Sequence, residues 1–191
     1  MAIKNSLFII IFVQFFNCAG TNYKKLSIEN PTKLVAVQDS LLSVSGDNQR
    51  IRDALVIANN SVAKGYLNAG DLKLAFQHFN KSISINGDNK ESVFGLLIAE
   101  GRILIKKGNK NGIWDAIEKF SRASSLFPKD GEPFYWMAQS YTKLGDTEFD
   151  LILESYEKSL ALDLDEGLRL EVEKSYKIAK NRKSKLDSFW K

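Results

Sequence analysis

The chain has 191 residues, of which 44% are hydrophobic and 26% charged, and this balance excludes an intrinsically disordered protein. Its formal net charge of +4 is too small to indicate nucleic-acid binding, so no nucleic-acid partner is expected. One cysteine and one histidine exclude an intramolecular disulfide and a zinc site of the usual Cys/His kind, and no cofactor or metal is expected.

The first segment, residues 1–17, has the composition of a secretory signal peptide. Lys4 precedes an apolar run from Leu7 to Phe16, which is too short to span a bilayer. Cys18 follows directly, and this arrangement resembles a bacterial lipoprotein signal, in which the chain is acylated on the cysteine and cut just before it. Residues 15–17 depart from the usual motif, so an ordinary secretory signal or a short membrane anchor is the alternative.

This resemblance implies a cellular location as well as a modification. A lipid anchor on Cys18 would hold the protein in the bacterial cell envelope, at the periplasmic face or the cell surface of the outer membrane. Residues 18–33 are polar and contain Asn30-Pro31, and they predict a lipidated tether ahead of a folded domain over 34–191.

From residue 34 onward, apolar residues recur at helical spacing. Residues 34–44 predict one amphipathic lead helix that is closed by Ser45 and Gly46, with Asp47 as the N-cap of the next helix. A continuous apolar stripe from Ile51 to Tyr66 then predicts a long helix that ends near residue 70.

One pattern recurs three times in the middle of the chain. A small or apolar residue is followed four positions later by an aromatic ring, and a helix and a Gly-Asp turn precede the pattern at least twice. The three pairs are Ala75 with Phe79, Ala116 with Phe120, and Ile152 with Tyr156. The pattern resembles the tetratricopeptide repeat, in which small residues let two helices approach and an aromatic ring fills the gap between hairpins.

The resemblance implies an all-α fold, a right-handed α-solenoid of about three degenerate helical hairpins, over residues 56–89, 90–130 and 131–163. Because Ala75 and Ala116 are 41 residues apart, more than the 34 of the family, we expect an insertion in the second repeat, a polar turn over residues 106–112. Residues 166–190 predict a last amphipathic helix that caps the solenoid, giving about eight helices in all. A generic helical bundle is the alternative.

Motifs for catalysis are missing from the sequence: no phosphate-binding loop, nucleophile elbow or zinc-protease motif occurs. The chain is therefore expected not to be an enzyme. His78 falls between two packing positions of the first repeat and is expected at the surface.

In tetratricopeptide proteins, the first helix of each hairpin lines a concave face on which partners bind. Polar residues at four-residue spacing on these helices suit hydrogen bonding to a peptide backbone or a carboxylate. The residues expected to contact a partner are Asn60, Lys64, Asn68, Arg102, Tyr135, Gln139 and Lys143, with Gly95 and Ala99 also facing outward. Alternatively, these side chains are simply solvated.

The function expected from these features is a membrane-anchored, non-catalytic scaffold or assembly factor that holds a protein or peptide partner in the cell envelope. The alternative is a small-ligand-binding accessory lipoprotein of a solute-uptake system, which would need a pocket lined by Tyr135 and Trp136. The C-terminal helix is basic, and it predicts either contact with anionic lipid head groups or a solvated cap.

Overall fold

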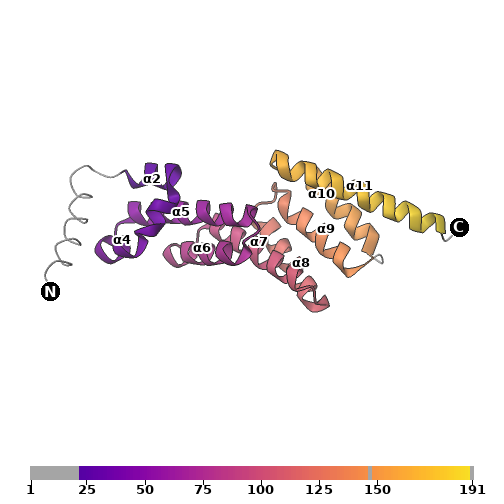
Figure 1. Cartoon of the computed structure of the whole chain (residues 1–191), viewed down its shortest axis with the longest axis horizontal. Helices are drawn as coiled ribbons and strands as arrows, with labels where there is room; N and C mark the ends of the chain where they lie inside the picture. Colours follow the sequence, from indigo (N-terminus) through magenta and orange to yellow (C-terminus); the bar gives the residue numbers. More distant parts are fainter. Residues whose placement is uncertain (1–21, 146–147, 190–191) are drawn as a thin grey trace, which may run out of the picture.

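The helices form an elongated array, and the computed structural model describes residues 22–145 and 148–189 of it. Over these residues the chain has ten helices, α2 to α11, and no strand. The helix α2 lies near one end of the array and the C-terminal end of α11 at the other (Figure 1). The all-α class expected from the sequence is confirmed.

Three short helices cover the N-terminal end: α2 (Tyr23–Glu29), α3 (Pro31–Ala36) and α4 (Gln38–Ser45). Asn22 and Asn30 cap α2 and α3, because each side chain accepts a hydrogen bond from a backbone N–H of the first turn. Ser27 and Leu34 are fully buried where α2 and α3 pack on α5 (Gln49–Asn68).

The predicted tether is therefore wrong over residues 22–33, which are part of the folded domain; Cys18 and residues 19–21 lie outside the described residues. The predicted single lead helix is also wrong, because Val37 has φ −108° and ψ 10° and separates α3 from α4. The N-cap of α5 is Asn48 and not Asp47, because Oδ1 of Asn48 accepts hydrogen bonds from the backbone N–H groups of Arg50 and Ile51.

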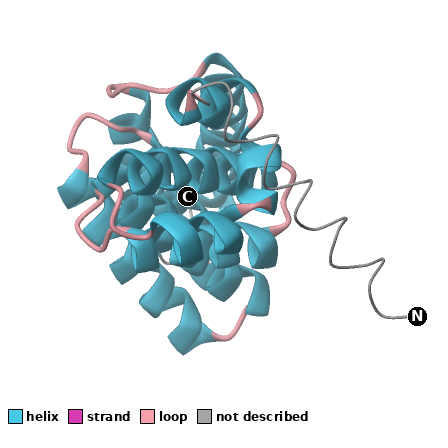
Figure 2. Ribbon diagram, turned by 90° about the vertical axis from the view of Figure 1, so that its left-hand side faces the viewer, coloured by secondary structure: helices cyan, strands magenta, loops and turns pink. Residues whose placement is uncertain are grey.

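The rest of the chain consists of three helical hairpins and a final helix. The hairpins are α5 with α6 (Leu72–Ile85), α7 (Lys90–Lys107) with α8 (Lys110–Leu126), and α9 (Glu132–Leu144) with α10 (Phe149–Leu160). Each helix packs mainly on its neighbours in sequence, and loops join the helices (Figure 2). The final helix α11 (Glu166–Phe189) packs on α10, as expected for a cap.

The extra length of the second repeat is helical. Only Gly108 and Asn109 separate α7 from α8, with Gly108 in the left-handed region at φ +74°. Ala116 lies six residues after the start of α8, whereas Ala75 lies three residues after the start of α6. The predicted polar turn lies inside residues 106–112, but it is only two residues long, and the expectation that the insertion is a loop is wrong because the rest of this range belongs to α7 and α8.

The recurring pairs occupy equivalent buried positions. Ala75, Ala116 and Ile152 are buried, and so are the aromatic rings four residues after each of them. The first two rings pack on glycines of α7: a Cβ atom on Gly95 would lie 2.2 Å from the Phe79 ring, and one on Gly101 would lie 2.4 Å from the Phe120 ring.

Gly95 and Ala99 are buried, so the expectation that they face outward is wrong. The Phe79 and Phe120 rings cover the side of α7 that carries Gly95 and Gly101. Because the second helix of each hairpin buries one of the recurring pairs and successive helices pack on one another, the chain has an all-α helical-repeat fold, and the described residues contain ten helices where about eight were expected.

Candidate functional site

A groove lies where the first helices of the three hairpins meet. Its volume is about 310 Å³, and it runs between the C-terminal half of α5, the N-terminal half of α7 and the loops that precede α9 and α11. The residues that line it are Lys64, Leu67, Asn68, Phe79, Glu91, Phe94, Gly95, Phe127, Asp130, Glu132 and Asp165. We call this hollow the acidic groove.

Four of the lining residues carry a carboxylate and only Lys64 carries a positive charge. Glu91 belongs to the first turn of α7, and Glu132 to the first turn of α9. Among the described residues, no ion pair joins Lys64 to any of the four carboxylates. The groove therefore has an excess of negative charge, although the whole chain is positive.

Two backbone hydrogen bonds bring the acidic loops together. Gly131 donates to the carbonyl of Asp163 at 2.8 Å, and the Asp163 N–H donates to the carbonyl of Lys129, also at 2.8 Å. This pairing fixes the loop before α11 against the loop before α9, so that Asp165 and Asp130 face the same hollow.

Burial changes the acidity of the groove. The pKa of Asp130 is raised mainly by burial and further by Asp163, although the backbone N–H of Glu132, which donates to Asp130 Oδ1 at 2.8 Å, and the charge of Lys64 oppose the rise. The pKa of Glu132 is raised mainly by burial, and the indole of Trp136, which donates to Glu132 Oε1 at 3.0 Å, opposes this rise. Both carboxylates are thus poorly solvated.

The floor of the groove is aromatic. Phe79 is fully buried beneath it, and Phe94 and Phe127 are half-buried. The rings of Phe94 and Phe127 meet edge to face, with centroids 5.2 Å apart. The groove therefore combines an apolar surface with carboxylates around it.

A stack of aromatic and charged groups continues from the groove along α7 and α9. Phe120 stacks on Trp136 with ring centroids 6.4 Å apart, and the Arg102 guanidinium lies 4.4 Å from the centroid of the Trp136 ring. The pKa of Arg102 is lowered by burial, while Glu132 acts in the opposite direction. Arg102 is therefore held by the stack and by nearby carboxylates.

The structure separates the seven residues expected to bind a partner. Lys64 and Asn68 are exposed and line the acidic groove, and Lys143 is exposed near the C-terminal end of α9. Arg102 is half-buried in the stack just described, and Gln139 is half-buried, where its Nε2 donates to the Tyr156 hydroxyl at 2.9 Å.

Asn60 and Tyr135 are buried, so the expectation that they face a partner is wrong. Asn60 is 4% exposed and donates to Asn89 Oδ1 at 3.2 Å, while it accepts from the hydroxyl of Ser92 at 2.9 Å. Tyr135 is 2% exposed and its hydroxyl donates to Glu171 Oε1 at 2.6 Å. Burial and this bond raise the pKa of Tyr135. Both side chains join helices to each other.

The four carboxylates of the groove were missed because the sequence reasoning considered only the middle of the first helices. A signal for them exists: acidic residues recur at each junction between hairpins and before the cap. The junction residues are Asp88, Glu91, Asp130, Glu132, Asp163, Asp165 and Glu166. Four of them, Glu91, Asp130, Glu132 and Asp165, line the groove.

His78 is half-buried, and the expectation of a surface histidine is wrong. Its Nδ1 lies 3.0 Å from Oδ1 of the buried Asn59, and its ring stacks on Tyr66 with centroids 5.6 Å apart. Asn59 in turn donates to Oε1 of Gln38 at 2.6 Å. The pKa of His78 is lowered mainly by burial and also by Lys81, which favours the neutral ring.

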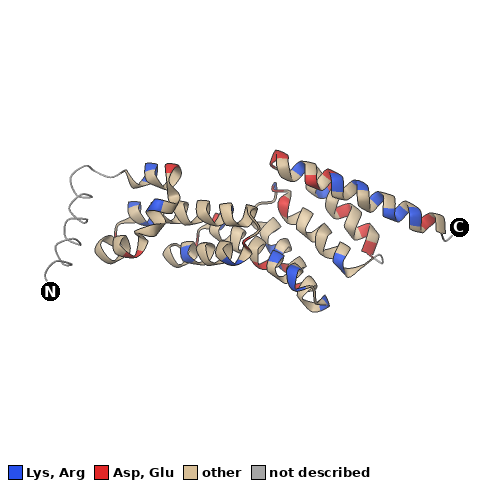
Figure 3. Cartoon of the chain, in the orientation of Figure 1, with Lys and Arg blue, Asp and Glu red and all other residues tan. Residues whose placement is uncertain are grey.

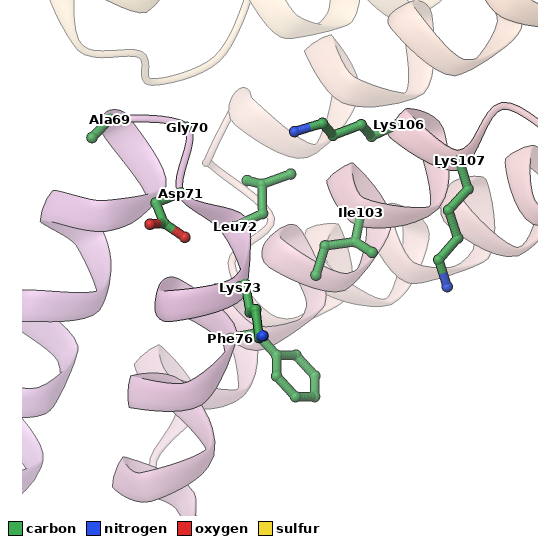
Figure 4. A pocket seen from close by; sticks show the side chains of 9 residues that line it. All are labelled: Ala69, Gly70, Asp71, Leu72, Lys73, Phe76, Ile103, Lys106 and Lys107. Carbon is green, nitrogen blue, oxygen red and sulfur yellow. The ribbon is translucent and has the colours of Figure 1, made fainter.

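A larger hollow of about 690 Å³ lies at the tips of the first two hairpins, away from the junctions. Ile103 of α7 faces Leu72 and Phe76 of α6 across it, with Lys106 and Lys107 on the α7 side (Figure 4). Its charged groups are exposed, whereas two of the four carboxylates of the acidic groove, Asp130 and Glu132, are half-buried. We therefore place the candidate site in the acidic groove.

The cap helix α11 is rich in lysine and arginine. Lysines and arginines follow one another along the C-terminal half of α11 (Figure 3), and Leu170 and Ile178 are exposed on the same helix. Val172 and Ala179 are buried against the body. Contact with anionic lipid head groups and a solvated cap therefore both stay predictions for α11.

Comparison with known proteins finds solved structures that are similar to this chain. No protein-family model matches the chain, and no curated protein matches it. The crystal structure of MamA is similar, with 20% sequence identity, a TM-score of 0.47, and coverage of 89% of this chain and 98% of that chain. The fold stated above rests on the helix packing of the chain itself.

Two further findings concern the described residues only. None of their helices combines the length and the apolar character that crossing a bilayer requires. No three histidine, cysteine or acidic side chains among them are grouped so that they could hold a metal ion.

Proposed function

We propose that this protein is a non-catalytic scaffold of the bacterial cell envelope that holds a protein partner in the acidic groove. The observation that supports this most directly is the groove itself, which the first helices of successive hairpins build from exposed Lys64 and Asn68, carboxylates and an aromatic floor.

The second part of the proposal is a lipid anchor on Cys18, which rests on the sequence. The described residues begin at Asn22, and in the sequence residues 19–21 lie between Cys18 and this point. Such a segment spans at most about 14 Å when extended. An anchor there would hold the N-terminal end of the array close to the membrane, with the acidic groove and α11 farther along the chain.

The small-ligand alternative is less well supported. The aromatic rings expected to line its pocket are used in packing: Tyr135 is buried, and Trp136 contacts both Phe120 and Arg102. The acidic groove is open and charged, which suits a polypeptide better than a small apolar ligand.

The anchor is tested by replacing Cys18 with alanine. We expect Cys18→Ala to abolish labelling by radioactive palmitate and to move the protein from the membrane fraction to the soluble fraction, with an unchanged far-ultraviolet circular dichroism spectrum. Continued labelling, or continued membrane association without labelling, would overturn the lipoprotein proposal. Chemical crosslinking in cells, followed by mass spectrometry, then identifies the partner and shows whether its capture needs the anchor.

A further inference from the structure

We infer that the partner enters the acidic groove with a basic segment, and that a lysine or arginine side chain of this segment lies on the aromatic floor between the carboxylates. This inference rests on the proposed function and specifies the chemistry of the partner. It reverses the expectation from the sequence, which was that Lys64 and its neighbours would hold a carboxylate or a peptide backbone.

The acidic groove has an excess of negative charge. Four carboxylates face the hollow and one ammonium group, that of Lys64, stands among them without an ion pair to any of the four. The entire chain has a net charge of +4, so the negative groove is a local feature and not a result of composition. A cation that approaches this protein is therefore attracted by the groove and repelled by much of the remaining surface.

The acidic groove also has an aromatic floor. Phe94 and Phe127 are half-buried and pack edge to face, so apolar ring surface stays open beside the carboxylates. Lysine and arginine side chains bury their methylene stems on apolar surface while the charged end reaches a polar group, and their cations are attracted by aromatic faces. A glutamate or aspartate side chain would gain neither contact.

The four carboxylates of the acidic groove are spread over different parts of the chain. They come from three separate segments: Glu91 from α7, Asp130 and Glu132 from the junction before α9 and its first turn, and Asp165 from the junction before α11. The two backbone bonds of Asp163 hold the last two segments together. Acceptors spread over three segments fit an extended chain with more than one cation better than a single small ion.

The test uses a short fluorescein-labelled peptide in which lysine alternates with alanine, and a matched peptide with glutamate in place of lysine. We expect fluorescence anisotropy to show that the folded protein binds the lysine peptide, that added NaCl weakens this binding, and that the glutamate peptide does not bind. Binding of both peptides with similar affinity, or no binding of the lysine peptide, would overturn the inference.

Variants locate the binding. Glu91→Gln combined with Asp130→Asn should weaken binding of the lysine peptide by about fivefold or more, because each lost charge pair at a solvated site is worth up to about 1 kcal/mol. Asn at position 130 keeps an oxygen for the hydrogen bond from Glu132. The matched control removes two exposed carboxylates outside the groove, Asp39→Asn with Glu154→Gln, and should change affinity less than twofold, about the size of weak long-range screening effects.

A third variant tests the sign of the effect. Lys64→Gln removes the cation of the groove and should tighten binding of the lysine peptide; weaker binding would contradict the inference. If the lysine peptide fails to bind but a natural protein is still crosslinked to the groove in cells, the basic-segment inference falls and the proposed scaffold function stands. If crosslinking also fails at the groove, the proposed function falls as well.

Discussion

Replacing Gly101 by alanine tests the packing scheme on which the whole array depends. The new methyl carbon would lie 2.4 Å from Cε1 and 2.5 Å from Cζ of Phe120, well inside van der Waals contact. Phe120 is fully buried and stacks on Trp136, and Arg102 covers that ring in turn. The ring can therefore make room only if the stack moves with it.

Two opposing effects determine how Gly101→Ala changes the free energy of unfolding. Overpacking of a dense core costs about 1–3 kcal/mol, and alanine is better than glycine in a helix by about 1 kcal/mol. We therefore expect Gly101→Ala to lower the free energy of unfolding by about 1 kcal/mol, which corresponds to a fall in Tm of about 2–4 °C for a chain of this size.

The chain supplies a matched control. Gly65 lies inside α5, and a Cβ atom there would meet nothing within 4 Å. Gly65→Ala should therefore stabilise the protein by about 0.5–1 kcal/mol through helix propensity alone. Urea unfolding followed by circular dichroism measures both variants. The packing argument is refuted if Gly101→Ala proves as stabilising as Gly65→Ala, or if the cost of Gly101→Ala is the same in a Phe120→Leu background, where the ring is gone.

Two further predictions concern polar groups that the array buries. Because the pKa of His78 is lowered by burial and by Lys81, the unfolded chain takes up a proton below its ordinary pKa of 6.5 that the folded chain does not, so stability falls as the pH falls. His78→Gln should reduce the loss of unfolding free energy between about pH 7 and about pH 5, and an unchanged loss would contradict this assignment. Asn60→Ala should cost about 1–3 kcal/mol, because it leaves the buried partners Asn89 and Ser92 with fewer hydrogen bonds. Asn68→Ala, at an exposed position of the same helix, should change the unfolding free energy by less than about 0.5 kcal/mol; equal costs at the two positions would contradict the observed burial.

The repeats could be predicted because their packing leaves a local record in the sequence. Ala75 with Phe79 and Ala116 with Phe120 share one spacing, and all four side chains are fully buried, each ring against a glycine of α7. The turns inside the hairpins also leave a record, because Gly70, Gly108 and Gly145, which have positive φ, follow the first helix of each hairpin.

The N-terminal helices could not be predicted in this way. The segments of α2 and α3 are short and polar, and isolated helices of this length are unstable in water. They form because Tyr23, Leu26 and Leu34 pack on α5, a contact between parts of the chain that spacing within either segment does not reveal.

The candidate site was only partly visible in the sequence for a related reason. Asn60, Lys64 and Asn68 lie on one helix at equal spacing, yet the first is buried against α7 and the other two line the acidic groove. Their difference depends on how far α7 overlaps α5, which the degenerate motif does not specify. The carboxylates opposite them come from loops, whose positions depend on the pairing of Gly131 with Asp163.

The central claim, that the groove side of the first helices receives a protein partner, is tested most directly by site-specific photo-crosslinking in cells. A photoreactive amino acid replaces Asn68 in the acidic groove, and in a control chain it replaces Gln77, which is exposed on α6 outside the residues that line the groove. The account predicts a discrete crosslinked protein from position 68 that is missing, or much weaker, from position 77. Equal crosslinking from both positions, or a discrete product from position 77 alone, would contradict it.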